Sequence, residues 1–426
     1  MIDGLNAVAT LLVLAAIFGA INYHWLKLPS TIGLVLIALA SSLGLLALEG
    51  VMPGINIAGQ IGGALSELDF ADVLLQGMLS FLLFAGALHV DLGQLRQRAA
   101  AIATMATFGV VLSTFLVGAA MWGVFRLVGL EVPFIYCLVF GSLISPTDPV
   151  AVLGILKTAK VPPALEAKIA GESLFNDGVG VVIFLILAGI AAGGGNGDEA
   201  SAGAITWLLL QEAVGGGLLG LLTGALAFYV IRTIDEHNLE VIVTLALVTG
   251  TYQVATALHL SGPIAVVVAG LLIGNHGTRL AMSDTTRERL SNFWTLIDEI
   301  LNAVLFLLIG LEVLILTLVG SHILAGLMAI PIVLLARFIA VGLPIRGLGM
   351  FQEFTKGAIR VLTWGGLRGG ISVALALSLP ASEFRDPLLT ACYAVVVFSI
   401  VVQGLTIGLL VRRIVPSADR IEASGH

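Results

Sequence analysis

Long apolar runs are the feature that most limits how this chain folds. About thirteen stretches, most of them near 20 mainly apolar residues, recur along the sequence, and a helix of about 20 such residues crosses the hydrocarbon core of a bilayer. Of the 426 residues, 58% are hydrophobic and only 11% are charged, whereas soluble domains carry about a quarter charged residues. A soluble fold of this size cannot bury so much apolar side chain. We therefore predict an all-α polytopic membrane protein.

The distribution of basic residues supports this set of spans and predicts its orientation. All Lys and Arg residues except Arg126, Arg337, Arg368 and Arg385 fall on one side when the spans alternate, and basic residues mark the cytoplasmic side. We expect an outside amino terminus, one transmembrane domain over 1–413, and a short cytoplasmic tail over 414–426. The predicted spans lie near 5–22, 30–48, 70–90, 100–125, 133–155, 168–192, 204–231, 239–258, 262–275, 297–319, 322–343, 358–379 and 387–411.

Composition also excludes several other classes of protein. The chain has no basic stripe with interleaved aromatic residues, so nucleic-acid binding has no support. Cys137 and Cys392 lie in apolar runs, where they form neither a disulfide framework nor a metal knuckle; we expect buried structural thiols. No basic region precedes the first apolar run, so we expect that run to be retained as a span.

The fifth span has a break at its centre, which reads Ser145, Pro146, Thr147, Asp148, Pro149. Two prolines remove two backbone donors and interrupt a helix. Irregular backbone at this depth lines a cavity or is buried in protein, and transporters bind ions at such broken helix ends. Asp148 can cap the second half-helix, and Thr147 offers a hydroxyl and a carbonyl. The alternative is a proline kink in which Asp148 is only a buried cap.

The sixth span concentrates polar side chains within one and a half turns: Glu172, Ser173, Asn176 and Asp177. Ser173 and Asp177 are four residues apart and share a helix face. Their oxygens suit a small alkali cation, and the carboxylate can take a proton instead. Ionisable residues inside a span are costly and usually functional. The alternative is a buried polar cluster that only holds helices together.

The twelfth span contains Arg368 between glycine pairs at 365–366 and 369–370. Glycines weaken a helix, and an arginine keeps its charge, so Arg368 needs a carboxylate partner. The candidates are Glu172 and Asp177. We expect Glu172, because a binding carboxylate locked to an arginine cannot exchange ions. The fifth and twelfth spans, which contain these two breaks, cross the membrane in opposite directions. This indicates inverted repeats with the site between them.

The tenth and eleventh spans hold further charges. Asp298 and Glu299 lie near the predicted cytoplasmic end of the tenth span, and a solvated funnel mouth is the simplest interpretation. Glu312 lies at its other end. Arg337, in the eleventh span, is expected to pair with one of these acids.

Five motifs together resemble the monovalent cation–proton antiporters of the NhaP/NHE branch. They are FLLFAGALHVDLGQLR at 81–96, SPTDPVAV at 145–152, GESLFNDGVGVV at 171–182, FLLIGLE at 306–312 and WGGLRGGISVALAL at 364–377. The resemblance covers nearly the whole chain. It implies a thirteen-helix fold with inverted repeats and crossed broken helices, a homodimer, and an elevator-like movement of a core domain.

The resemblance also assigns roles residue by residue. Asp177 matches the ion-binding aspartate, and Na⁺ is expected at Asp177, Thr147 and Ser173. The resemblance also places Glu172 in the ion-binding set, where it would contact the ion through a water molecule. The supporting residues are Asp148, Asn176, which would tie the site to the broken fifth span, and Arg368, which matches the arginine that pairs with the acid at 172.

The expected function is electroneutral one-for-one exchange of Na⁺ or Li⁺ for H⁺ in the plasma membrane, by competition at one carboxylate, in the service of pH homeostasis. A K⁺/H⁺ antiporter is a close alternative, and a cation channel a more distant one, since no filter sequence such as TVGYG is present. We expect no enzyme activity and no cofactor. The GxGD pattern at 195–198 lies in a glycine-rich loop, and the chain has no Walker-type phosphate loop. The expected partners are lipid, protons, monovalent cations and a second copy of the chain.

Overall fold

The computed structural model describes residues 4–52, 77–93, 99–148, 163–193, 202–234, 236–277, 282–314, 316, 319–348 and 357–414. Every regular element in these ranges is helical, so the expected all-α fold is confirmed. The α-helices are α1 (Gly4–Ile21), α2 (Ser30–Val51), α5 (Leu79–Leu88), α7 (Ala99–Thr104), α8 (Val110–Leu127), α9 (Phe134–Ile144), α11 (Pro163–Ala191), α12 (Ala202–Arg232), α13 (His237–Ala257), α14 (Gly262–Leu272), α16 (Asp284–Leu311), α17 (Gly320–Leu348), α18 (Ala358–Trp364), α19 (Gly370–Leu377), α20 (Arg385–Phe398) and α21 (Gly404–Ile414).

Five short helical segments extend or join these helices. The π-helical ones are η1 (Asn22–Leu26), η3 (Met105–Gly109), η4 (Ile273–Gly277) and η6 (Ser399–Gln403), and η5 (Glu312–Leu314) is a 3₁₀ turn. Through η3 and η6, α7 runs into α8 and α20 runs into α21. Local π geometry inside a longer helix is often found at functional sites, and η6 touches the candidate site described below.

Eight of the described helices are long and apolar enough to cross a membrane. Three further apolar helices, Leu79–Leu88, Phe134–Ile144 and Gly262–Gly277, are shorter. Each of the thirteen predicted spans overlaps at least one described helix, but the number that cross a membrane stays a prediction. Exposed leucines at 218, 222 and 226 form a stripe along α12, as expected of a helix whose outer face contacts lipid rather than water.

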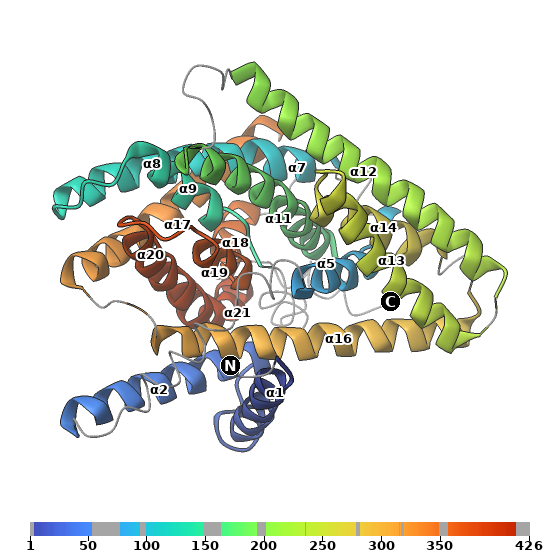
Figure 1. The fold of residues 1–426 in the computed structure, drawn as a ribbon, viewed down its shortest axis with the longest axis horizontal. Coiled ribbons are helices and arrows are strands. Elements are labelled where there is room, and N and C mark those ends of the chain that lie inside the picture. Colours follow the sequence, from blue (N-terminus) through green and yellow to red (C-terminus); the bar gives the residue numbers. More distant parts are fainter. Residues whose placement is uncertain are drawn as a thin grey trace.

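The helices form a layered bundle with the broken segments at its centre (Figure 1). The long helix α16 runs along one side, with α1 and α2 beyond it, and α12 follows the opposite edge. Between them lie α9, α11, α18 and α19. Cys137 and Cys392 are free and buried, as predicted.

Two broken segments meet in this centre. The helix α9 ends at Ile144, and residues 145–148 continue without helical structure, so the predicted break in the fifth span is confirmed. The twelfth span is interrupted between α18 and α19. The Asp148 backbone N–H donates to the Leu367 carbonyl at 2.8 Å, so the two breaks touch through their backbones. The second half of the fifth span, which Asp148 was expected to cap, lies outside the described residues.

Candidate functional site

The polar residues of α11 face the break that follows α9. Glu172, Ser173, Asn176 and Asp177 are all buried, with at most 3% of each exposed. Asn176 Oδ1 accepts from the Thr147 backbone N–H at 3.1 Å, and Asn176 Nδ2 donates to Thr147 Oγ1 at 2.8 Å. Asn176 thereby supplies the partner that the Thr147 N–H lacks where the helix is interrupted.

Asp177 is buried in this site and forms no salt bridge with a basic side chain in the described residues. Its Oδ1 has no hydrogen-bond partner among the described residues, although the residue is only 3% exposed. Ser173 lies one turn earlier on the same face of α11, and its hydroxyl is 3.0 Å from Thr147 Oγ1. The site therefore holds a carboxylate with one unpaired oxygen on the helix face that also carries the Ser173 hydroxyl, which in turn touches that of Thr147. Such oxygen ligands suit a small cation, and an unpaired buried carboxylate is costly unless a cation or a proton neutralises it.

A close approach between α11 and the break fixes their relative position. A Cβ at Gly180 would lie 2.3 Å from Pro146 Cγ, so no side chain fits between α11 and the break. Gly180, three residues after Asp177, thus lets Pro146 pack directly on α11, as small residues do where membrane helices approach closely.

The partner of Glu172 differs from the one expected. Arg337 of α17 binds Glu172 through two parallel hydrogen bonds, at 2.5 and 2.9 Å, and this pair is the one buried salt bridge in the described ranges. The predictions that Glu172 pairs with Arg368, and that Arg337 pairs with an acid of the tenth span, are therefore wrong. Arg337 projects from α17 over Gly366, where a Cβ would lie 2.7 Å from its Nε, so this glycine leaves room for the guanidinium.

Arg368 instead bonds to the end of α9. Its Nη1 donates to the carbonyl of Ser145 and, at 2.7 Å, to that of Pro146. The last carbonyls of a helix lack partners and form the negative end of its dipole, so a guanidinium is stabilised there without a carboxylate. The Arg368 backbone N–H donates to Ser399 Oγ of η6 at 2.9 Å. Arg368 lies within electrostatic range of Glu172 and Asp177, yet forms no salt bridge with either in the described parts.

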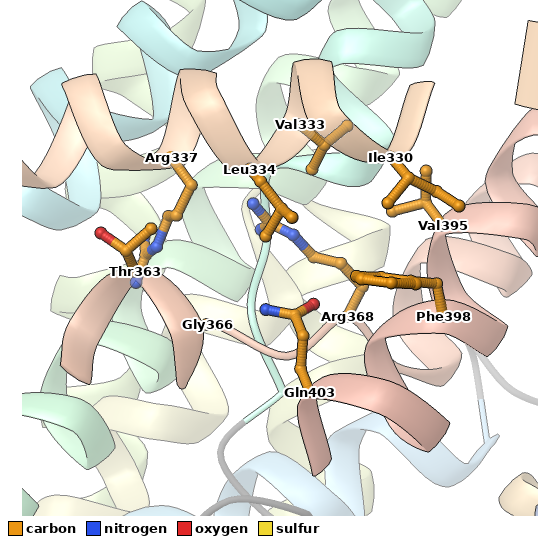
Figure 2. Close-up of a pocket in the computed structure, with 10 residues that line it drawn as sticks. All are labelled: Ile330, Val333, Leu334, Arg337, Thr363, Gly366, Arg368, Val395, Phe398 and Gln403. Carbon is orange, nitrogen blue, oxygen red and sulfur yellow. The ribbon is translucent and has the colours of Figure 1, made fainter. Parts of the chain in front are cut away.

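A small pocket adjoins the two arginines. Figure 2 shows Arg337 reaching down from α17 beside Thr363, Arg368 rising from the break, and Gln403 below them. Most of the remaining lining is apolar. Two guanidinium groups repel a cation, so this pocket is not the cation site. The Gln403 side chain donates to the Trp364 carbonyl at 2.9 Å and so supports the end of α18.

Two further carboxylates approach the site from α16 and the break. Asp148 is half-buried, and its Oδ2 lies 2.2 Å from where a Cβ of Gly369 would be. Its charge acts on Asp177 and also on Asp298 of α16. Asp298 is half-buried and accepts from Asn302 Nδ2 at 3.0 Å, while Glu299 is exposed. The funnel mouth expected at Asp298 and Glu299 stays a prediction.

Ser399, Gln403 and the pairing of Arg337 with Glu172 were not predicted from the sequence. Arg337 was visible as a charge inside an apolar span, and a buried arginine needs hydrogen-bond acceptors, often a carboxylate. Which of the acids within the spans pairs with Arg337, however, depends on how α17 packs against α11. Ser399 and Gln403 gave no signal, because single polar residues near a span end are common.

Three comparisons with known proteins place this geometry in context. The family profile described as "Sodium/hydrogen exchanger, transmembrane" matches residues 12–413. The chain is 48% identical over 420 residues to the Na⁺/H⁺ antiporter NhaP of Pseudomonas aeruginosa, covering 96% of this chain and 97% of that protein. It is 37% identical to the Na⁺/H⁺ antiporter NhaH of Halobacillus dabanensis, covering 91% and 93%. The fold is similar to the sodium proton antiporter MjNhaP1 of Methanocaldococcus jannaschii, with a TM-score of 0.71, 20% identity and 99% coverage of both chains.

Proposed function

The chain belongs to the sodium/hydrogen exchanger family, and we propose that this multi-pass membrane protein is a secondary active antiporter that exchanges Na⁺ or Li⁺ for H⁺. The observation on which the proposal rests most is the Asp177 carboxylate, buried with one oxygen unpaired, where the two broken segments meet. The names of the relatives support sodium over potassium as the cation.

Asp177 binds one proton or one cation in turn. Each complex is locally neutral, whereas the empty carboxylate carries a charge that is costly to move through an apolar barrier. Only the loaded forms therefore change sides readily, and this couples the two fluxes. Because one positive charge moves in each direction, the exchange is electroneutral and one-for-one.

The neighbouring residues shape the site around Asp177. Thr147 and Ser173 present hydroxyl oxygens to the cation, and Asn176 holds Thr147 in place through two hydrogen bonds. Glu172 acts on the cation indirectly, since both its carboxylate oxygens are held by Arg337. Asp148 attracts the cation, and Arg368 holds the end of α9 against α19.

The remaining features of the proposal concern assembly and placement. The protein lies in the plasma membrane with its amino terminus outside and its carboxyl terminus in the cytoplasm, as the distribution of basic residues indicates. It works as a homodimer in which the core bundle moves, carrying the ion at Asp177 from one face to the other.

The test is an exchange assay in proteoliposomes that contain the purified chain and a pH-sensitive dye. Na⁺, Li⁺ and K⁺ are added in turn against an imposed pH gradient. We expect Na⁺ and Li⁺ to collapse the gradient at a rate that does not depend on a membrane potential set with valinomycin and K⁺. Collapse by K⁺ alone would make the protein a K⁺/H⁺ antiporter, and a rate that follows the potential would contradict the one-for-one stoichiometry.

A further inference from the structure

A second group of buried polar side chains lies where α16 ends and where α17 and α20 begin. In Figure 1 the end of α16 and the start of α17 lie at the left of the view. Six residues there each have a buried side-chain atom without a hydrogen-bond partner in the described ranges: Glu312 Oε2, His322 Nδ1, Ser382 Oγ, Arg385 Nε, Thr390 Oγ1 and Tyr393 Oη. Buried polar groups are nearly always bonded, so several unpaired ones at one end of the bundle indicate a site.

The carboxyl group of Glu312 is the centre of this group. Thr390 and Tyr393 are three residues apart and share a face of α20, and the charge of Glu312 acts on Tyr393. Arg385 is within electrostatic range of Glu312. The Arg385 guanidinium nevertheless donates to the Leu377 carbonyl at 2.9 Å and forms no salt bridge with Glu312 in the described parts of the chain.

Among the described residues, few charged groups lie on the surrounding elements; on α20 itself, Asp386 follows Arg385 and is exposed. On α17, His322 lies one turn before Gly326, whose Cβ would be 2.9 Å from Ala394 Cβ, so this face of α17 packs against α20. On α2, which contacts η5, Glu49 is half-buried. The helices α1, α5 and α19 also contact α16 and contain no ionisable side chain. The contact with α13 is at Trp294, about five helical turns from Glu312.

The chemistry of this group suits a proton better than a metal ion. Glu312 is only 2% exposed, and a buried carboxylate without an ion-pair partner is costly in its charged form. A cation there would be repelled by Arg385, whereas a proton neutralises the carboxyl group in place. We propose that Glu312 is a second proton-binding site, near the unpaired hydroxyls of Thr390 and Tyr393, and that its protonation tunes the pH range in which exchange occurs.

The helix α20 connects this site to the broken segment. Thr390 and Tyr393 lie in the middle of α20. Between them, Cys392 Sγ donates to the Ser372 carbonyl of α19 at 3.4 Å. Beyond the carboxyl-terminal end of α20, Ser399 accepts from the backbone of Arg368. We expect a change of charge at Glu312 to act on the helix that holds the α18–α19 break and, through space, on Asp177.

The first test measures proton binding without transport. The purified, reconstituted protein is examined by infrared difference spectroscopy across a pH series, following the stretch of protonated carboxyl groups. Wild type should show a titrating band that is absent in Glu312→Gln and unchanged in Glu383→Gln, whose side chain is exposed at the same end of the bundle. A spectrum that Glu312→Gln leaves unchanged would overturn the proposal. In Tyr393→Phe the band should titrate at higher pH, because a polar hydroxyl that can stabilise the charged form is lost, and an unaltered titration would also count against the proposal.

The second test measures the pH profile of exchange in the same variants, and this effect rests on the proposed function. Loss of the negative charge leaves Arg385 unopposed and makes proton binding at Asp177 less favourable. We therefore expect Glu312→Gln to shift the midpoint of the profile to lower pH by about 0.7 unit or more, which corresponds to a coupling of about five-fold, and Glu383→Gln to leave it in place. Superimposable profiles would overturn the regulatory role. Absence of exchange in wild type would refute the proposed function instead, and the infrared band would still decide whether Glu312 binds a proton.

Discussion

The buried pair Glu172–Arg337 predicts a specific pattern of stabilities among four variants. The perturbations are Arg337→Met, Glu172→Gln and the double change, compared with wild type. Both partners are buried, and their two parallel hydrogen bonds are 2.5 and 2.9 Å long. The structure therefore predicts strong coupling between these two positions, which are 165 residues apart in sequence.

The magnitude follows from what each change leaves behind. Arg337→Met leaves the Glu172 carboxylate buried and unpaired, and breaking a buried pair from one side costs about 3–5 kcal/mol. Arg368 lies within electrostatic range of Glu172 and can compensate in part, so we expect about 3 kcal/mol. Glu172→Gln leaves the positive charges of Arg337 and Arg368 facing each other, so its cost in unfolding free energy should be near the upper end of the range of about 3–5 kcal/mol. The double variant has no unpaired charge, and its cost should be about 2 kcal/mol or less.

The assay is chemical unfolding in detergent micelles, followed by tryptophan fluorescence, for all four proteins. We expect a coupling free energy of about 3 kcal/mol or more between the two positions. The exposed Arg360 of α18 is the matched control, and Arg360→Met should change stability by about 0.5 kcal/mol or less. Additive single-variant costs would refute the assignment of Arg337 as the partner of Glu172. Coupling of Glu172 to Arg368 instead would restore the pairing expected from the sequence.

Three other predictions concern the candidate ion site. Asn176→Ala removes both hydrogen bonds to Thr147, at 3.1 and 2.8 Å. Each buried polar group left unpaired costs about 1–3 kcal/mol. The rate of exchange in proteoliposomes should therefore fall about ten-fold or more. Gly180→Ala places a Cβ 2.3 Å from Pro146 Cγ and should lower the unfolding free energy by about 1–3 kcal/mol, whereas Gly189→Ala on the same helix meets no atom within 4 Å and should be neutral or stabilising. Competition at one carboxylate means that protons displace Na⁺ at low pH. The apparent KM for Na⁺ should therefore rise about ten-fold per pH unit on the acid side, while the maximal rate stays constant. A falling maximal rate at constant KM would exclude direct competition.

The sequence predicted the spans and the breaks because both depend on local physics. Runs of apolar residues determine which segments enter the bilayer, and Pro146 and the glycines around Arg368 interrupt helices wherever they lie. The cluster on α11 was also visible, because residues four apart on one helix necessarily share a face. These are properties of short segments, and they need no knowledge of how the segments pack.

The pairing of charges was not predictable in the same way. Glu172 had two buried arginines within reach, Arg337 and Arg368, and hydropathy gives no distance between α11 and α17. The expectation also assumed that a buried arginine needs a carboxylate. Arg368 meets this need with the carbonyls of Ser145 and Pro146, which are free only because the helix breaks there. Sequence motifs thus identify the candidate residues of an ion-binding site. The packing of the helices decides which of these residues form ion pairs with one another and which remain unpaired.

The most direct test of a single shared carboxylate is proton release on sodium binding, measured with purified protein in weakly buffered detergent solution at a pH where the site is protonated. Addition of Na⁺ should release one proton for each Na⁺ bound in wild type and none in Asp177→Asn, with choline as the control cation. Proton release that persists in Asp177→Asn, or Na⁺ binding in wild type without any release, would contradict competition at Asp177.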